Sequence, residues 1–291
     1  MKFAAMMMLA AAGCVGPSGN GGEEVETSSA GAVDASKAYF LCVGMEYSWR
    51  FGSCPGCKND AVALGNLMRE KYGYDGEVLI SEYATKYTIS SKLKEGIEAT
   101  PEDGLFLFFY SGHGGQEALG GSEPDGADRK DEFLCLYDDY MLDDEIWEIV
   151  RKCRGRVFLY FDACHSATMY RSVAASVKAR DGKASALESE MAQTTGFTFS
   201  PSSISSASPL ETSARNAVRM LCWSGCKEEE YSYGGSKGGT LTLAVLRNWK
   251  TGVSYQSLWS SARQTVVTQQ PTQHPVATSI GGGFDDMEVF K

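Results

Sequence analysis

The sequence predicts an α/β fold in which a mainly parallel central sheet is flanked by helices. Uninterrupted apolar runs, typical of strands covered on both faces, alternate along the chain with segments whose apolar residues recur at helical spacing. The clearest strands are the runs Leu105–Tyr110 and Val157–Phe161. The clearest helical face carries Ile89, Leu93 and Ile97. Because strands that alternate with helices build layered domains around one sheet, these patterns favour a sheet with helices on its faces.

The other elements follow from local patterns of the same kinds. Strands are expected at Tyr39–Val43, Glu77–Ile80, Phe133–Tyr137, Val218–Trp223 and Val276–Thr278. Helices are expected at Asp60–Tyr72 and at the segments that carry Ile146, Ile149 and Val150, then Leu241, Ala244 and Val245, then Tyr255, Leu258, Trp259, Ala262 and Val266. Three helix ends are expected from stop and cap residues: Gly73 after the first helix, Thr88 before Ile89, and Asp143 or Asp144 before a helix that Gly155 closes.

The chain before residue 37 has a different character. An apolar run, Phe3–Ala12, follows Lys2 and predicts a signal segment at 1–13. It is too short to span a bilayer. Residues 14–36 are rich in Gly, Ser and Glu and have almost nothing to bury, which predicts a flexible tether. The ordered domain is therefore expected at 37–291.

The end of the signal segment, Ala11-Ala12-Gly13-Cys14, resembles the lipobox of bacterial lipoproteins. This resemblance implies lipidation of Cys14, with that anchor as the protein's only membrane contact. The expected location is the bacterial cell envelope, and the outer membrane is favoured because Val15, not Asp, follows the cysteine. A plain signal peptide with secretion, or a mis-assigned start, is the alternative.

Composition excludes several classes of protein. With 43% hydrophobic and 22% charged residues, the chain is an ordinary globular protein that can bury a sizeable core. Its net charge of -10 argues against a nucleic-acid partner, which needs a basic face. The nine cysteines are irregularly spaced and do not form a small disulfide framework. The pairs Cys54/Cys57 and Cys222/Cys226 leave open a zinc site or a disulfide within a pair.

Two segments that directly follow buried strands carry reactive side chains. The first, Tyr110–Gly115, holds His113 between glycines, and the second, Asp162–Ser166, holds Cys164. Each alone is equally compatible with a structural turn or a buried thiol. Together they are the parts of a nucleophile and its base, because a cysteine attacks as the thiolate. His165 is a weaker candidate base, since adjacent side chains point apart.

These segments resemble the signatures of metacaspases, which are caspase-like cysteine peptidases. His113 precedes Cys164 by 51 residues, and caspase-type enzymes have about 50 between the two. Four further matches are Gly56–Ala61, Glu123–Gly126, Asp143–Ile146 and Ser224–Lys227. The resemblance covers residues 37–291 and implies a caspase-like three-layer sandwich. It divides this domain into a large-subunit-like part (37–172), a processing linker (173–216) and a small-subunit-like part (217–291).

The resemblance also implies roles for individual residues. Cys164 is the nucleophile and His113 the general base, while the backbone N–H groups of Gly114 and Cys164 form the oxyanion hole. The matching positions of the specificity pocket are Cys57, Asp60, Ser111 and Asp162. Two carboxylates there favour polypeptide substrates with Arg or Lys, cleaved after the basic residue. The alternative is that Asp60 only caps its helix and Asp162 only accepts local N–H groups.

No cofactor is expected to be required, although many metacaspases are activated by calcium. The weak calcium candidates are Asp128, Asp131, Asp143 and Asp144. Where the family has a further aspartate, this chain has Arg171, which would repel the ion. Two other functions stay open at this stage: a non-catalytic surface module that binds basic peptides, and a cysteine acyltransferase that uses the same two residues.

Overall fold

The computed structural model describes residues 37–48, 52–118, 130–164, 218–227, 230–282, 284 and 287–291, all within one compact unit. The signal segment, the tether and the 173–216 linker lie outside the described residues, as do Cys14, Asp128 and Arg171. The side chain of Asp131 also lies outside them. The predictions that rest on these residues are therefore not tested by the structure.

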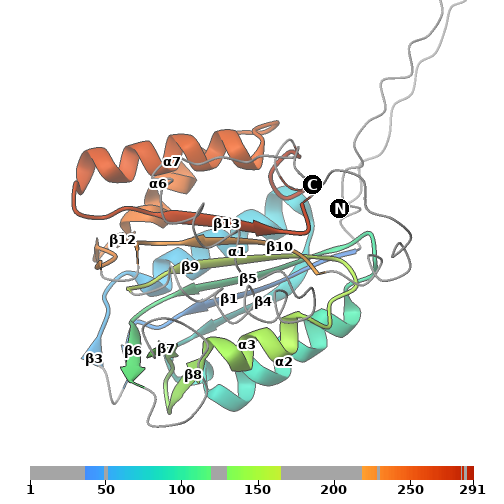
Figure 1. Ribbon diagram of the computed structural model, residues 1–291, viewed down its shortest axis with the longest axis horizontal. Coiled ribbons are helices and arrows are strands. Elements are labelled where there is room, and N and C mark those ends of the chain that lie inside the picture. Colours follow the sequence, from blue (N-terminus) through green and yellow to red (C-terminus); the bar gives the residue numbers. More distant parts are fainter. Residues whose placement is uncertain are drawn as a thin grey trace, which may run out of the picture. The chain divides into compact units, whose positions relative to one another are not determined.

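A six-stranded sheet forms the centre of the domain, with strand order β13-β10-β9-β5-β1-β4 (Figure 1). Its strands are β1 (Ala38–Gly44), β4 (Asp75–Ile80), β5 (Leu105–Ser111), β9 (Arg156–Asp162), β10 (Arg219–Ser224) and β13 (Val276–Ile280). All neighbouring pairs are parallel except β10 and β13. The predicted mainly parallel sheet is thereby confirmed.

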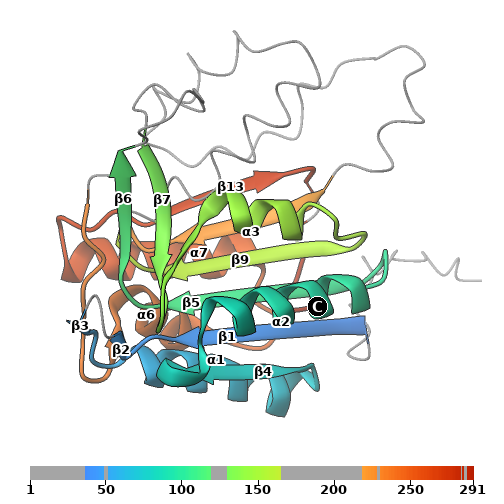
Figure 2. The ribbon, with the colours of Figure 1, turned by 90° about the horizontal axis from the view of Figure 1, so that it is seen from below.

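Helices cover both faces of this sheet (Figures 1 and 2). One face carries α1 (Cys57–Tyr72), α6 (Thr240–Asn248) and α7 (Tyr255–Gln269), and the other carries α2 (Lys86–Ala99) and α3 (Asp143–Val150). The pleat of β5 explains the division. Leu105, Leu107 and Phe109 enter the first core, whereas the alternating Phe106, Phe108 and Tyr110 enter the second. The run is continuously apolar because both faces are buried.

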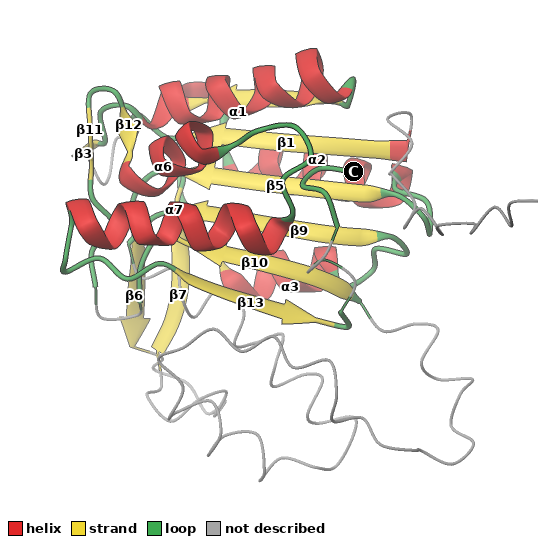
Figure 3. Ribbon diagram, turned by 90° about the horizontal axis from the view of Figure 1, so that it is seen from above, coloured by secondary structure: helices red, strands yellow, loops and turns green. Residues whose placement is uncertain are grey.

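Smaller elements gather at the carboxyl ends of the parallel strands (Figures 2 and 3). They are the hairpin β2 (Tyr47–Ser48) and β3 (Gly52–Ser53), the three-stranded sheet β6 (Gly114–Ala118), β7 (Lys130–Cys135) and β8 (Tyr140–Leu142), the pair β11 (Gly234–Gly235) and β12 (Gly238–Gly239), and a 3₁₀ turn, η2 (Ser81–Tyr83). Of these, only β7 overlaps a predicted strand. The others are too short or too rich in glycine to show a hydrophobic period.

Two predicted helix caps are wrong, and one helix end is confirmed. Thr85, not Thr88, caps α2: its hydroxyl accepts a hydrogen bond from the Thr88 N–H at 3.1 Å. The cap of α3 is Leu142, whose N–H donates to Glu145 Oε2 at 3.0 Å, so Asp143 is already helical. That helix also ends at Val150, before the predicted stop at Gly155. Gly73 ends α1 in the left-handed conformation, as predicted.

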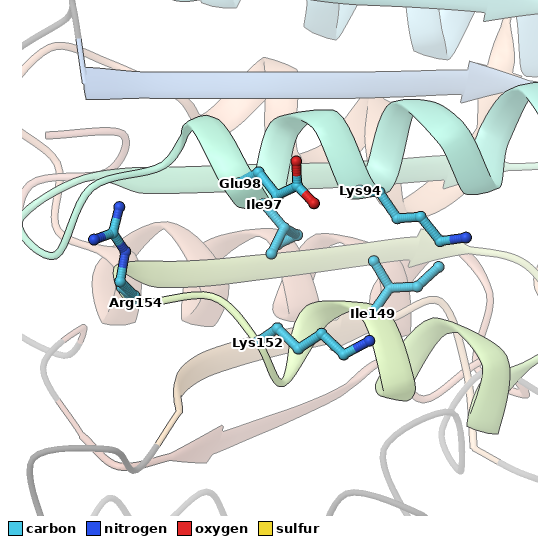
Figure 4. Close-up of a pocket in the computed structure, with 6 residues that line it drawn as sticks. All are labelled: Lys94, Ile97, Glu98, Ile149, Lys152 and Arg154. Carbon is cyan, nitrogen blue, oxygen red and sulfur yellow. The ribbon is translucent and has the colours of Figure 1, made fainter.

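A cavity of about 360 Å³ lies between α2 and α3 (Figure 4). It is lined by Lys94, Ile97, Glu98, Ile149, Lys152 and Arg154. These residues belong to the C-terminal ends of the two helices and the turn that follows, at the edge of the sheet where the parallel strands begin. The cavity is thus at the opposite end from the strand ends that carry His113 and Cys164. In the described part of the chain, no helix combines the length and hydropathy needed to cross a bilayer.

Candidate functional site

The register of two neighbouring strands brings the candidate nucleophile and base to one edge of the sheet. Ser111 at the end of β5 is paired with Asp162 at the end of β9. His113 and Cys164 each follow two residues later, so both lie beyond the same pair of strand ends (Figure 3). Crevices at the carboxyl ends of parallel strands are where α/β folds bind ligands. The site is therefore built by pairing between strands that are distant in the sequence.

The backbone of His113 is held by a buried tyrosine. The Tyr110 hydroxyl lies 2.8 Å from the carbonyl oxygen of His113 and 2.7 Å from that of Cys135, and these two acceptors share its single hydrogen. The Cys135 N–H donates to the His113 carbonyl at 3.0 Å. The imidazole Nε2 lies 3.2 Å from the Ser53 carbonyl oxygen. The ring therefore extends from a fixed backbone towards the β2–β3 hairpin.

Cys164 is partly exposed, and its thiol faces a different loop. The Sγ atom donates to the Ser232 carbonyl oxygen at 3.7 Å. Burial raises the pKa of this thiol, and the Ser232 contact only partly opposes that effect. The thiol is thus protonated at neutral pH and needs a base before it can attack. Among the described contacts, the His113 ring and the Cys164 thiol are not hydrogen-bonded to each other.

Gly114 and Cys164, whose backbone N–H groups are assigned to the oxyanion hole, approach each other closely. A Cβ atom on Gly114 would collide with the carbonyl oxygen of Cys164. Glycine at 114 is what permits this close approach of the two chains. Both N–H groups are therefore within one small region, although their role as oxyanion donors stays a prediction.

Asp60 is buried against Ser111 at the end of β5, and its two oxygens differ in their contacts. Its Oδ2 accepts from the Ser111 hydroxyl at 2.7 Å and from the Gly239 N–H at 2.8 Å, whereas its Oδ1 has no hydrogen bond among the described residues. Burial, followed by the charge of Asp162, raises the pKa of Asp60 to about 8. The interpretation of Asp60 as a helix cap is wrong, because Gly56 precedes α1 and the carboxylate bonds to other elements.

Asp162 is buried as well, but its oxygens are fully used. Its Oδ1 accepts from the Ser232 hydroxyl at 2.7 Å, and its Oδ2 accepts from the N–H and the hydroxyl of Thr242, both at 2.8 Å. Burial raises the pKa of this carboxyl above its ordinary value, and the three donors only partly oppose that effect. Its donors lie 70 and 80 residues away, so the alternative of purely local bonds is wrong.

The two buried carboxylates are not paired with a cation from the part of the chain that the structure describes. No Lys or Arg of the described chain forms an ion pair with either Asp60 or Asp162. Cys57 and Ser111, the other predicted pocket residues, are also buried there, and Ser111 contacts Asp60 directly. Two adjacent buried negative groups repel each other unless one is protonated or a positive group enters.

Several residues of this region were missed by the sequence analysis. Ser232 and Thr242 hold Asp162, and Gly238 and Gly239 pack against the carboxylates so closely that a Cβ atom on either would collide with Asp60 or Asp162. Gln273 is fully buried and donates to the Gly225 carbonyl at 2.8 Å and the Ser232 hydroxyl at 3.1 Å. The glycine-rich run before α6 was the only available signal, because repeated glycines indicate close backbone approach.

The residues considered for metal binding do not assemble among the described side chains. There, no group of three or more His, Cys, Asp or Glu residues is placed to hold a metal ion. Asp143 is buried at the start of α3 and Asp144 is exposed. Cys222 and Cys226 have separate partners, Ser224 for the first and the carbonyls of Ala163 and Glu230 for the second. The carboxylates that the structure describes thus do not fit a calcium site by themselves, and no chemical step is assigned to calcium.

Comparison with known proteins identifies the family. A model of the caspase domain matches residues 37–281. Among curated proteins, metacaspase-1 of Kluyveromyces lactis is 27% identical over 274 residues, covering 80% of this chain and 59% of that protein. Metacaspase-1 of Pyricularia oryzae is 36% identical over 146 residues, covering 44% of this chain and 36% of that protein. The chain spans about a third to three fifths of the length of these relatives.

Solved structures share the same architecture. Protein GSU0716 from Geobacter sulfurreducens has a TM-score of 0.59 at 21% identity, covering 87% of this chain and 98% of that one. Caspase-1 from Spodoptera frugiperda has a TM-score of 0.54 at 15% identity, covering 86% and 89%. These likenesses confirm the predicted caspase-like α/β fold. Since the family match extends from β1 to the end of β13, the chain belongs to the caspase-domain family of cysteine peptidases.

Proposed function

We propose that this chain is a cysteine endopeptidase that hydrolyses peptide bonds after Arg or Lys. The observation that carries the proposal is the pair of buried carboxylates, Asp60 and Asp162, of which Asp162 lies close to Cys164. Among the described residues, no Lys or Arg forms an ion pair with either carboxylate, and Asp60 Oδ1 accepts no hydrogen bond. A guanidinium or ammonium group from a substrate would supply both the missing charge and the missing donor. An acidic substrate side chain would instead add a further negative charge beside Asp162, which disfavours it.

In the proposed mechanism, His113 removes the proton of the Cys164 thiol, and the thiolate attacks the scissile carbonyl carbon. The negative charge that develops on the carbonyl oxygen is stabilised by the N–H groups of Gly114 and Cys164. The C–N bond then breaks, the leaving amine takes the proton from His113, and an acyl-enzyme remains on the cysteine. A water molecule, deprotonated by the same imidazole, hydrolyses that thioester and restores the thiol.

His113 and Cys164 have separate contacts, so we infer that the substrate helps to bring them together for proton transfer. In the resting site the imidazole faces Ser53 and the thiol faces Ser232. A nucleophile and its base often come within hydrogen-bond reach only when the substrate is bound. Each side chain has one contact to a carbonyl oxygen, and the thiol contact is long. Rotation of either side chain therefore breaks only one weak hydrogen bond. We infer that a bound peptide displaces these contacts and brings the two groups together.

The direct test is turnover of fluorogenic peptides that differ only in the residue before the scissile bond. The purified chain is expected to release the fluorophore from an arginyl or lysyl amide and to spare the aspartyl and neutral analogues. Cys164→Ala and His113→Ala should abolish turnover, while His165→Ala should retain most of it and serves as the matched histidine control. Undiminished activity of pure Cys164→Ala would contradict the mechanism.

The same experiment separates the competing functions. A non-catalytic module would bind the arginyl peptide without cleaving it, whereas an acyltransferase would release the fluorophore faster when an amine acceptor is added. Hydrolysis at a rate independent of added amines is the result that supports a peptidase. Partners of the proposed enzyme are polypeptides with exposed basic residues, in keeping with the net charge of -10.

A further inference from the structure

Cys54 and Cys57 contact each other at the start of α1. Cys54 and Cys57 enclose the dipeptide Pro55-Gly56, and their sulfur atoms are 3.0 Å apart, with the Cys57 thiol donating to Cys54. Both are free thiols in the structure. No role in the proposed hydrolysis requires Cys54, and Cys57 contributes only to the pocket wall. The contact therefore calls for a separate explanation.

The turn that carries the pair is held at both ends. The Cys54 N–H donates to the Glu46 carbonyl at 2.8 Å, and the Cys57 N–H donates weakly to the Cys54 carbonyl at 3.4 Å. Gly56 precedes α1 with φ of 96°, a left-handed conformation that a side chain would strain. A Cβ atom there would also collide with the β11–β12 strand pair. The sulfur contact is thus a consequence of a rigid turn.

The two thiols differ in exposure and acidity. Cys54 is partly exposed, whereas Cys57 is buried at the first position of α1. The hydrogen bond from Cys57 lowers the pKa of Cys54, and the same bond together with burial raises the pKa of Cys57. A thiolate at Cys54 also lies near the positive end of the α1 dipole. An exposed nucleophilic sulfur beside a buried protonated one is the arrangement of a redox-active Cys-x-x-Cys pair.

We propose that Cys54 and Cys57 form a reversible dithiol–disulfide site. With a low-molecular-weight disulfide as oxidant, the Cys54 thiolate attacks one of its sulfur atoms, forms a mixed disulfide and expels one thiolate. Cys57 then loses its proton and attacks the Cys54 sulfur, which expels the second thiol and closes the intramolecular bond. The two cysteines lose two electrons and two protons, and the oxidant gains both as two thiols.

Geometry selects this pair over the other described cysteines. A disulfide bond is about 2.05 Å long, so the sulfurs at 3.0 Å need an approach of only about 1 Å. Cys222 and Cys226, also close in sequence, contact other groups. Burial raises the pKa of Cys42, Cys153 and Cys222, which makes those thiols poor nucleophiles. The competing product is a bond between Cys54 and Cys164, since Cys54 lies close enough for its charge to raise the pKa of the Cys164 thiol.

The position of the pair places the modification beside the candidate site. Ser53, the residue before Cys54, provides the carbonyl that contacts the His113 imidazole at 3.2 Å. Cys57 is followed three positions later by Asp60 on the same first turn of α1. The Cys54–Cys57 disulfide would therefore lie between the Ser53–His113 contact and Asp60. The proposal itself does not depend on peptidase activity, because the bond is detected directly.

The sequence permits a test with an internal control. Trypsin cleaves after Arg50 and Lys58 and releases Phe51–Lys58, which holds Cys54 and Cys57 and no other cysteine. It also cleaves after Arg219 and Lys227 and releases Met220–Lys227, which holds only Cys222 and Cys226. The full chain, as wild type and as Cys164→Ala, is equilibrated with glutathione disulfide. It is then denatured in an alkylating reagent, digested and analysed by mass spectrometry.

The expected result is a Phe51–Lys58 peptide that has lost two hydrogen atoms and carries no alkyl group, at oxidant concentrations that leave Met220–Lys227 doubly alkylated. Dithiothreitol should restore alkylation of the first peptide. Cys57→Ser should trap a glutathione adduct on Cys54, whereas Cys54→Ser should leave Cys57 unmodified. Double alkylation of Phe51–Lys58, equal oxidation of both peptides, or a bond from Cys54 to Cys164 in the wild type would each overturn the proposal.

Discussion

Replacing Asp60 with Asn tests the origin of the proposed basic specificity. The amide preserves the size of the side chain and can still accept from Ser111 and Gly239, but it removes the charge and turns the unbonded Oδ1 position into an N–H donor. A desolvated guanidinium that loses its buried partner costs about 3–5 kcal/mol. At about 1.4 kcal/mol per factor of ten, kcat/KM for an arginyl peptide should fall by roughly 10²–10³-fold or more.

The pH dependence gives a sharper signature of the same residue. With a pKa of about 8, Asp60 is protonated in most molecules of the free enzyme at neutral pH. A cationic substrate binds the ionised form, so its kcat/KM should rise as the pH increases towards 8. The ionisation of Cys164 and His113 affects all substrates alike. The ratio of kcat/KM for an arginyl and a neutral peptide therefore isolates Asp60, and it should increase up to about tenfold per pH unit below 8.

The free energy of unfolding should decrease as the pH rises, whereas kcat/KM for the cationic substrate increases. An unfolded Asp has a pKa of about 4, and burial raises that of folded Asp60 to about 8. The stability associated with the protonated carboxyl is fully present below pH 4 and is lost as the pH rises through 8. The loss is on the order of 5 kcal/mol at most, from about 1.4 kcal/mol per unit. Urea unfolding of Asp60→Asn should show a smaller decline between pH 5 and pH 9 than wild type.

The assay combines the two measurements. Steady-state rates on arginyl and neutral peptides, taken from pH 5.5 to about 9, are compared for wild type and Asp60→Asn, with Glu82→Gln as an exposed acidic control. Only Asp60→Asn should flatten the substrate ratio. If both substrates lose the same factor, or if the wild-type ratio is independent of pH, then Asp60 does not recognise the basic side chain.

Three predictions concern residues outside the described part of the chain. Stored wild-type protein should be cut after basic residues of the 173–216 segment and Cys164→Ala should not, because the sequence predicts a linker there and linkers are where nicking concentrates; identical intact masses would contradict this. A fatty-acid label should mark wild type but not Cys14→Ser, and absence of label from both would favour secretion. The resemblance to metacaspases places Arg171 where that family has an aspartate, so we predict that peptidase activity persists in excess chelator. Activity that is silent in chelator and restored by millimolar calcium would refute this, and Arg171→Asp should raise the dependence on calcium.

The sequence was informative wherever one local property decides the structure. β5 and β9 were predicted within one residue of their observed ends, because strands buried on both faces must be continuously apolar. The end of α1 followed from Gly73, which adopts a conformation that other residues avoid. The cap of α2 was misplaced because Thr85 and Thr88 are chemically equivalent candidates. Which of them accepts the bond depends on where the backbone leaves its helical path.

Some residues of the candidate site could be predicted from the sequence and others could not. His113 and Cys164 could be selected from the sequence because each follows a recognisable buried strand within a distinctive motif. Ser232, Thr242 and Gln273 could not, since their hydrogen bonds reach residues 41 to 80 positions away and leave no local pattern. Polar residues in a loop look alike until the fold decides which of them are buried and what they contact.

The sequence alone thus determined the layered fold, the order of its main elements and the two residues that carry the proposed chemistry. These follow from hydrophobic period and from motifs that are continuous along the chain. Only the tertiary structure decided three features: no cation of the described chain pairs with the buried Asp60 and Asp162, one oxygen of Asp60 has no hydrogen-bond partner among the same residues, and Cys54 contacts Cys57. The interaction between the two carboxylates, their burial and the sulfur contact all depend on distances between atoms. Those distances are determined by strand register and by the packing of α1 against the sheet.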